Sequence, residues 1–234
     1  MKKFIQSLLK SGGLELKKYR HVPKPLAWVK EAQIATVLDC GANIGQFAME
    51  LREELPEAKI YSFEPIPAVF SALIKNMAGD AHFRAFQTAI GEKDGSAEIN
   101  VSPYAPSSSL LPETEVIKKS FPHTVGGKKE TIQISRLDTA VKNLSLQKPI
   151  LLKLDVQGYE VKALEGAPET LKKVDFLLIE TSFVEMYKGQ PLFDDIYTLM
   201  KSQGFLYRGS VQIKKDPREG TVIFEDSLFI RKKF

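Results

Sequence analysis

The sequence predicts an α/β fold in which a mostly parallel β-sheet lies between two layers of helices. Apolar runs with β character alternate along the chain with runs whose apolar residues recur at helical spacing. Repeated strand–helix units favour a parallel sheet with helices on both faces, because the chain must cross a face to reach the next parallel strand. The last two apolar runs read as a pair of strands, which predicts a hairpin near the C-terminus.

The N-terminal half of the chain contains two predicted strand–helix units, followed by two further predicted strands. The first helix carries apolar residues at helical spacing from Ile44 to Leu55, and the second strand ends at Glu64-Pro65. A turn over 91–95 separates the last two strands of this half. The predicted elements are a strand over 36–39, a helix over 44–55, a strand over 59–63, a helix over 67–77 and strands over 82–90 and 97–101.

Residues 102–130 interrupt this alternation. The segment holds several prolines, a run of serines and the pair Gly126-Gly127. Long irregular loops inside compact domains are often functional. We therefore predict an insertion, or lid, that covers the active site.

The C-terminal half returns to strands and helices. The run PILLKLD over 149–155 is typical of a buried parallel strand. The helix that follows it is expected to stop near Gly166 and Pro168. The elements are strands over 131–135, 149–155 and 175–179, helices over 137–144, 159–164 and 193–203, and final strands over 205–208 and 222–230.

Acidic residues gather where the predicted parallel strands end. The five strand ends are Asp39, Glu64, Ala89, Asp155 and Glu180, and four of them are acids. Turn residues such as Asn, Gly and Ser would serve equally well as structural strand ends. Ligands of open α/β sheets bind outside the carboxyl ends of the strands, so these acids predict a functional site.

The loop after the first strand argues against a phosphate-containing cofactor. A dinucleotide loop needs G-x-G-x-x-G so that its backbone can approach the pyrophosphate. Here Asn43 stands at the second glycine position, Gly45 comes one residue early, and Asp39 adds negative charge. No Gly-Lys-Ser/Thr follows, which excludes a P-loop.

S-adenosylmethionine (SAM) fits the same loop, because it carries a cationic sulfonium and no phosphate. Asp39 suits its ammonium group, directly or through water, and glycines let the loop pass close to the cofactor. Glu64 lies 19 residues after Gly45 and can accept hydrogen bonds from both ribose hydroxyls. Thr88 and Ala89 are expected to line the adenine pocket, and Ser109 could bond the SAM carboxylate. The predicted cofactor residues are Asp39, Gly41, Ala42, Asn43, Gly45, Phe47, Glu64, Pro65, Ile66, Thr88, Ala89, Ser109 and Asp155.

Five stretches resemble the FkbM family of SAM-dependent methyltransferases. They are VLDCGANIGQFA, YSFEP, QTAIGEKDGSAEINV, SRLDTAV and LLKLDVQGYEVKALEGA, in matching order from about Thr36 to Leu199. The resemblance implies O-methylation of hydroxyls on sugars and other natural products. It also implies the Rossmann-like class I methyltransferase fold, a three-layer sandwich whose seven-stranded sheet has six parallel strands and one antiparallel strand near the C-terminus. The chain departs from the family at Gln157, where the family usually has Glu.

Methyl transfer to oxygen needs an aligned acceptor and a group that removes its proton. Asp155 is the first candidate, as base, metal ligand or orienter of SAM, although an N-cap role is the structural alternative. Glu180 could meet Asp155 across the cleft, and the two carboxylates could hold Mg²⁺. His123 in the lid is a further candidate base, although a lone loop histidine is usually just exposed.

Two other residues near the strand ends have structural explanations. Lys153 alternates with Asp155 on one face of its strand, and a buried lysine needs a partner, for which Glu160 is a candidate. Cys40 points to the face opposite Asp39, so we expect it in the core rather than as a nucleophile.

Length and composition fit one methyltransferase domain over residues 1–234, with 1–34 as an N-terminal helical extension. The chain has 43% hydrophobic residues, a net charge of +4 and one cysteine. A short amphipathic helix is expected over 2–20, and no run approaches the ~20 apolar residues of a membrane span. The single cysteine excludes a disulfide framework and fits a cytoplasmic protein. The short basic groups favour a solvated surface over a nucleic-acid or membrane partner.

Four functions remain open on the sequence. The first is a SAM-dependent O-methyltransferase acting on a small hydroxylated acceptor. A nicotinamide-dependent oxidoreductase is disfavoured by the missing second glycine, and a non-catalytic SAM-binding module by the acids Asp155 and Glu180. Nucleic-acid methylation is disfavoured, because the chain has no N-P-P-[YF] type of motif at the fourth parallel strand. The acceptor and the oligomeric state are not encoded in a readable pattern.

Overall fold

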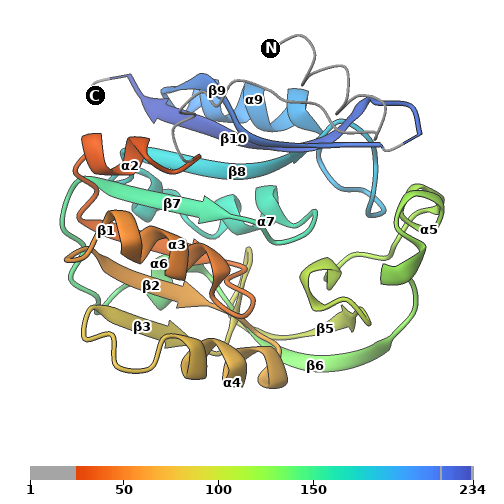
Figure 1. Ribbon diagram of the computed structural model, residues 1–234, viewed down its shortest axis with the longest axis horizontal. Helices are drawn as coiled ribbons and strands as arrows, with labels where there is room; N and C mark the ends of the chain where they lie inside the picture. Colours follow the sequence, from red (N-terminus) through yellow and green to blue (C-terminus); the bar gives the residue numbers. More distant parts are fainter. Residues whose placement is uncertain (1–24, 217, 233–234) are drawn as a thin grey trace, which may run out of the picture.

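The main sheet of the protein has seven strands in the order β3-β2-β1-β7-β8-β10-β9 (Figure 1). The computed structural model describes residues 25–216 and 218–232. Pairs from β3 to β8 are parallel, and β10 runs antiparallel to both β8 and β9, as predicted. The strands are β1 (Thr36–Cys40), β2 (Lys59–Phe63), β3 (Phe83–Phe86), β7 (Ile150–Leu154), β8 (Phe176–Ser182), β9 (Phe205–Lys215) and β10 (Val222–Arg231).

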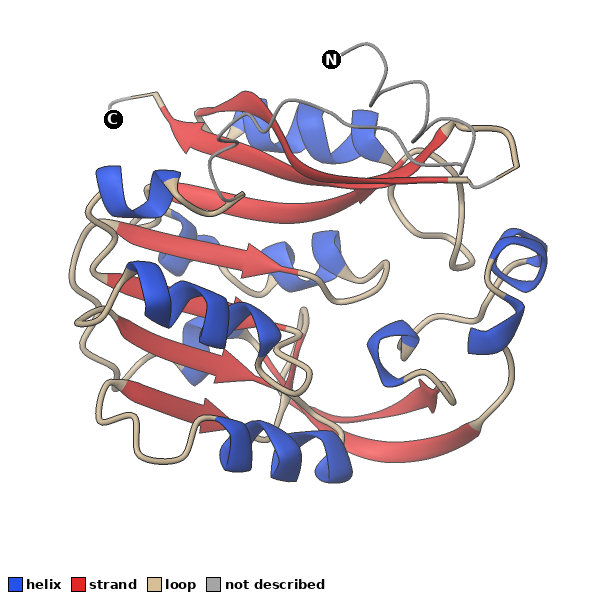
Figure 2. Ribbon diagram, viewed as in Figure 1, coloured by secondary structure: helices blue, strands red, loops and turns tan. Residues whose placement is uncertain are grey.

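Helices cover both faces of this sheet (Figure 2). The strands β1, β7 and β8 are buried along their whole length, as strands covered on both sides must be. Successive residues face opposite layers: Val37 packs with α2, α3 and α4, whereas Leu38 packs with α6, α7, α8 and α9. The helices are α2 (Trp28–Glu31), α3 (Gln46–Glu54), α4 (Pro67–Asn76), α6 (Leu137–Ala140), α7 (Glu160–Glu165), α8 (Pro168–Leu171) and α9 (Phe193–Ser202).

A second, three-stranded sheet extends the fold beyond the strand ends. Its order is β4-β6-β5, with β4 (Ala89–Ile90), β5 (Gly95–Val101) and β6 (Lys128–Ser135). The predicted continuous strand over 82–90 is therefore wrong, because the chain turns at Thr88, whose N–H bonds the carbonyl of Phe86, and changes sheet. The chain between β5 and β6 of this small sheet faces the ends of β1 and β7 in Figure 1.

The segment over 102–130 is less irregular than predicted. It contains the short helices η1 (Ala105–Ser107), α5 (Glu115–Ser120) and η2 (Pro122–Thr124), and β6 begins at Lys128 rather than at Thr131. Pro106 is the second residue of η1 and Pro122 the first residue of η2, where a missing N–H costs little. Whether the segment opens and closes as a lid stays a prediction.

Several element boundaries also differ from the prediction. Helix α3 begins at Gln46, not Ile44, because Gly45 has the left-handed conformation at the N-cap. Strand β9 continues to Lys215, well beyond the predicted Arg208, since ladder pairing with β10 sustains it where most of its side chains are exposed. The helix predicted over 2–20 lies outside the described residues. Among the described helices, none combines the length and apolarity needed to cross a membrane.

Candidate functional site

Two cavities open at the carboxyl ends of the parallel strands and share a wall. The first cavity holds seven of the predicted cofactor residues and several residues that the sequence did not indicate. Asp155, Gln157 and Pro106 line both cavities. The first cavity is lined by Gly41, Asn43, Phe63, Glu64, Pro65, Ile66, Ala89, Ile90, Ile99, Ala105, Pro106, Ser108, Leu110, Asp155, Val156 and Gln157.

Glu64 is held rigidly at the wall of the first cavity. Its Oε1 accepts a hydrogen bond of 2.9 Å from Ile66 N–H and its Oε2 one of 3.0 Å from Asn43 N–H. Burial raises the pKa of Glu64 to about 7, although both backbone donors favour the carboxylate. Each oxygen keeps a free lone pair, so the group can still accept the hydroxyls of a diol.

The loop over 41–45 needs glycine at both ends. Gly41 has φ +81°, and a Cβ there would lie 1.9 Å from the backbone oxygen of Asp155. Gly45 has φ +94° and packs on Leu73 of α4. Gly41 therefore lets the end of β1 lie against the end of β7, and Gly45 lets the loop lie against α4.

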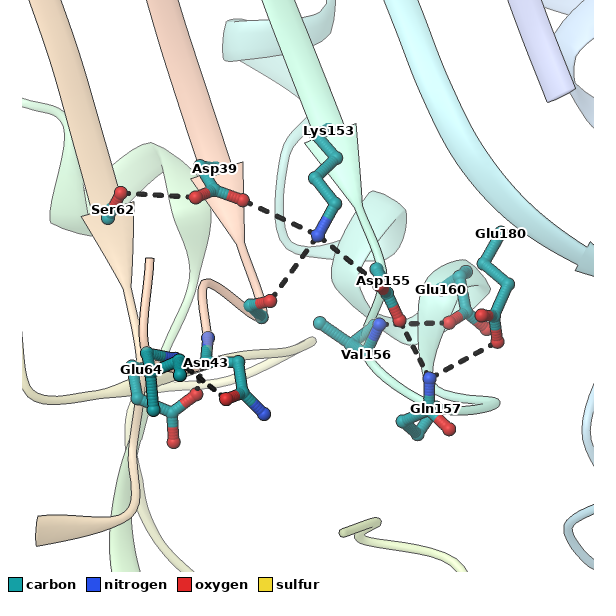
Figure 3. A network of polar contacts seen from close by, with 12 residues as sticks. Asp39, Asn43, Ser62, Glu64, Lys153, Asp155, Val156, Gln157, Glu160 and Glu180 are labelled. Atoms are coloured by element: carbon teal, nitrogen blue, oxygen red, sulfur yellow. Dashed lines mark hydrogen bonds and ion pairs between the residues drawn. The ribbon is translucent and has the colours of Figure 1, made fainter. Parts of the chain in front are cut away.

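A buried lysine links the ends of β1 and β7 (Figure 3). Lys153 Nζ lies 3.5 Å from Asp39 Oδ1 and 3.3 Å from Asp155 Oδ2. Burial alone would lower the pKa of Lys153, but the charges of Asp155 and Asp39 raise it above its ordinary range. The proposed pairing of Lys153 with Glu160 is wrong, because Glu160 instead accepts the N–H groups of Val156 and Gly158.

Asp39 therefore lies beneath the cavity rather than in its lining. Its side chain is fully buried, and Ser62 Oγ donates to it at 3.2 Å. Burial raises its pKa, which the positive charge of Lys153 partly offsets. A direct contact of Asp39 with SAM stays a prediction, and its contact with Lys153 offers an indirect route to the cofactor.

Gln157 joins the two predicted catalytic acids. Its Nε2 donates to Asp155 Oδ1 at 2.7 Å and to Glu180 Oε1 at 3.2 Å (Figure 3). Its Oε1 accepts the hydroxyl of Tyr187 at 2.8 Å. Its backbone has φ +53°, which is rare for such a side chain and is the kind of strain found at functional sites. The Nε2 group of Gln157 therefore holds the carboxyl groups of Asp155 and Glu180 close to each other.

The acids around this amide differ in exposure. The side chain of Asp155 is 31% exposed, whereas Glu180 is 8% exposed. Burial and the negative charge of Asp155 raise the pKa of Glu180 well above its ordinary range. Asp226, paired with Glu180 across β8 and β10, was not indicated by the sequence, and burial raises its pKa to about 6. Asp155 is therefore the more exposed of the two predicted catalytic acids, and it borders both cavities.

The second cavity brings the predicted lid against these acids. His123 and Tyr104 of the lid lie across the cavity from Asp155 and Glu180, and the rings of His123 and Tyr104 meet edge to face at 5.6 Å. The cavity is lined by Tyr104, Pro106, Ser107, Ile117, Phe121, His123, Thr124, Asp155, Gln157, Glu180, Met186, Tyr187, Lys214 and Phe224. Lys214 and Phe224 belong to the hairpin of β9 and β10, where no site residue was predicted.

The remaining predicted cofactor residues have other contacts. Ala42 and Gly45 are buried within the loop over 41–45. The ring of Phe47 packs against Lys153, whose Nζ lies 5.3 Å from the ring centroid. Thr88 donates to the carbonyl of Ala89 and to Ser135 Oγ. Ser109 donates to the carbonyl of Gln157 at 2.6 Å, so its only hydroxyl proton is already used. Their roles toward SAM stay predictions.

Within the described residues, the predicted metal site at Asp155 and Glu180 has no third ligand. Asp155 and Glu180 both approach Gln157, but the part of the chain that the structure describes contains no group of three His, Cys, Asp or Glu side chains suited to a metal ion. Cys40 is buried in the core on the face of Leu38, as expected.

Comparison with known proteins gives matches over most of the chain. The profile of the Methyltransferase FkbM domain matches residues 39–207. Methyltransferase 1 of Beauveria bassiana is 30% identical over 181 residues, which cover 72% of this chain and 71% of that protein. The 2-O-methyltransferase NoeI of Sinorhizobium fredii is 29% identical over 167 residues, 66% of each chain.

A solved structure shows a similar fold. The methyltransferase FkbM from Methylobacillus flagellatus superposes with a TM-score of 0.51 at 14% identity, over 84% of this chain. The match spans 43% of the length of that protein.

Proposed function

Since the chain belongs to the FkbM family of methyltransferases, we propose that it transfers the methyl group of SAM to a hydroxyl oxygen of a sugar, a glycoside or another small natural product. The predicted family, class I methyltransferase fold and SAM-dependent methyltransferase activity are confirmed. The relative NoeI, named a 2-O-methyltransferase, supports oxygen as the acceptor atom.

One observation carries this proposal: Asp155 and Gln157 form the wall between the two cavities. We assign the first cavity to SAM and the second to the acceptor. Glu64 would accept the ribose hydroxyls, and the apolar side chains of Ile66, Ala89 and Ile99 would hold the adenine. With both sites filled, a donor methyl and an acceptor hydroxyl would meet beside Asp155.

SAM supplies a methyl group already activated by its positive sulfur. The residues of the chain then have to align the acceptor oxygen for in-line displacement and take its proton. We propose Asp155 as the base, because its exposed carboxylate borders both cavities. Lys153 and Gln157 hold one oxygen each of Asp155 and so fix its direction. His123 is the alternative base on the opposite wall.

Calorimetric titration with SAM, and with NADH as a comparator, tests the first half of the proposal. We expect SAM but not NADH to bind, and Glu64→Ala to weaken SAM binding by about 10- to 100-fold, because hydrogen bonds to a charged group contribute ~1.5–3 kcal/mol. Equal SAM binding by the variant would reject the assignment of the first cavity. Binding of NADH would instead support an oxidoreductase.

Transfer of labelled methyl from SAM to a panel of glycosides tests the second half. Asp155→Asn should abolish transfer while SAM still binds, whereas loss of transfer only in His123→Ala would move the base to the lid. SAM binding without transfer to any acceptor would favour a non-catalytic SAM-binding module. Including EDTA and Mg²⁺ in parallel reactions tests the proposed metal at Asp155 and Glu180.

We also propose a reducing, cytoplasmic location, which the single buried thiol of Cys40 supports. Cell fractionation with an antibody against the protein checks it. Recovery in a secreted fraction would reject it.

A further inference from the structure

The second cavity is charged differently at its two ends. Asp155 and Glu180 lie at the sheet, together with the amide of Gln157. Lys214 comes from the distant hairpin of β9 and β10 and is the only lysine or arginine among the described lining residues. An acceptor that spans the cavity therefore meets acids at one end and a cation at the other.

Lys214 is free to bind a ligand. Its Nζ lies 5.9 Å from the ring centroid of Phe121, which places it over an aromatic wall of the cavity. No carboxylate of the described residues lies within ion-pair distance of it. Two other cations of the neighbouring elements are paired: Arg218 lies 2.8 Å from Asp216, and Lys118 lies 2.6 Å from Glu115.

Aromatic side chains line the space between these two ends. Tyr104, Phe121 and His123 form one group, with ring centroids 5.6 Å apart for Tyr104–His123 and 6.5 Å for Phe121–His123. Phe224, from the same hairpin as Lys214, belongs to the same lining. Aromatic faces bury the apolar C–H surface of a ligand ring while its polar groups bond at the edges.

We propose that the acceptor is a glycoside whose sugar ring carries an anionic substituent. This rests on the proposed methyltransferase function. The hydroxyl that receives the methyl group lies at Asp155, the ring lies against Tyr104 and Phe121, and the anionic group pairs with Lys214. The reverse orientation would place an anion beside the carboxylate of Asp155, where like charges repel. Lys214 thus sets both the class of the acceptor and its orientation.

Binding to the protein loaded with S-adenosylhomocysteine tests this without requiring turnover. The probes are 4-nitrophenyl β-glucuronide and 4-nitrophenyl β-glucoside, with glucose 6-phosphate and glucose as a second pair. Wild type should bind each charged probe about two- to fivefold more tightly than its neutral counterpart, as expected for one partly exposed ion pair. High salt should reduce the preference. The two pairs distinguish a carboxylate from a phosphate as the preferred anion.

Lys214→Met should remove the preference and leave binding of the neutral probes unchanged. Lys215→Met is the matched control, since it removes a lysine from the next position of β9 that does not line the cavity, and should keep the preference. A preference that survives Lys214→Met, equal binding of charged and neutral probes, or no binding of any probe would overturn the proposal. Methylation of neutral glycosides with no charge preference would leave the methyltransferase function standing, whereas absence of SAM binding would reject that function itself.

Discussion

Gln157 holds the carboxylate of Asp155, the proposed catalytic base, in place. Its amide donates to both Asp155 and Glu180, which a carboxylate could not do. Gln157→Glu would remove both hydrogen bonds and place a third acid between them, so we expect the acid limb of the pH profile of kcat/KM to move upward. We expect kcat itself to fall by about tenfold, because a hydrogen bond to a charged group contributes ~1.5–3 kcal/mol.

Calorimetry with SAM supplies the control for this variant, since the cofactor should still bind. An unchanged pH profile would mean that the amide acts only as a structural support. Gln157→Ala, which removes the donor without adding charge, should lower kcat without the same upward shift of the profile.

The raised pKa of Glu64 predicts that SAM binding depends on pH. Burial raises its pKa to about 7, so about a tenth of the groups are ionised at pH 6 and about nine tenths at pH 8. The ionised form accepts both ribose hydroxyls, and we therefore expect SAM affinity to increase up to about tenfold between these values. Titration calorimetry on Glu64→Gln should show a flatter dependence. A slope as steep in the variant would assign the effect to another group.

At the scale of elements, the segment from η1 to α5 is fastened to the strand-end edge of the main sheet by polar contacts. Ser109 Oγ donates to the Gln157 carbonyl, the hydroxyl of Tyr187 lies 3.0 Å from the Ser107 carbonyl, and Thr114 bonds the backbone of Glu185 and Met186. These contacts hold the wall of both cavities. Because they lie outside the strand ladders of the main sheet, we expect this segment to open without unfolding of that sheet.

Ser109→Ala tests this fastening. The change leaves the carbonyl of Gln157 and the N–H of Leu111 without their partner, at a cost of ~1–3 kcal/mol. Amide exchange in residues 102–124 should accelerate by about tenfold or more, with little change in the melting temperature. Ser202→Ala on the exposed end of α9 is the control. Uniform exchange across the protein would show that the segment unfolds only with the rest.

Elements with a strong internal pattern could be predicted, and those fixed by distant contacts could not. The apolar run of β7 and the amphipathic period of α9 can be recognised in the sequence, because burial determines where their apolar residues stand. The turn at Thr88 that sends the chain into the second sheet has no such pattern, and β9 is sustained beyond Arg208 by pairing with β10. Pairing partners lie far away in the sequence, so local periodicity does not contain them.

At the scale of the whole molecule, the parallel topology explains why the site was partly predictable. It brings strand ends to one edge, so Glu64 and Asp155 could be identified as acids at that edge. It did not indicate that Lys153 would separate Asp39 from the cavity, nor that Lys214 and Phe224 would reach the second cavity from the far hairpin. Those placements depend on tertiary packing rather than on a motif.

The same topology concentrates buried acids, which predicts that stability falls as pH rises. Burial raises the pKa of Glu160 from near 4.5 to about 7 and that of Asp226 to about 6, and Glu64 behaves alike. Such groups bind more protons in the folded protein than in the unfolded chain between about pH 4.5 and pH 7. The free energy of unfolding therefore decreases across this window, by ~3 kcal/mol at most for Glu160. The raised pKa of Lys153 acts only at much higher pH.

Thermal unfolding of the ligand-free protein at pH 5, 6, 7 and 8 checks this expectation. Since 1 kcal/mol shifts the melting temperature of a protein this size by ~2–4 °C, we expect a fall of roughly 5 °C or more between pH 5 and pH 8. Glu160→Gln keeps the oxygen that accepts the N–H groups of Val156 and Gly158 but cannot ionise. Its melting temperature should therefore exceed that of wild type at pH 8 and match it at pH 5. A melting temperature that rises with pH would show that these carboxyl groups ionise without cost, and that the acids at the strand ends are better solvated than their burial indicates.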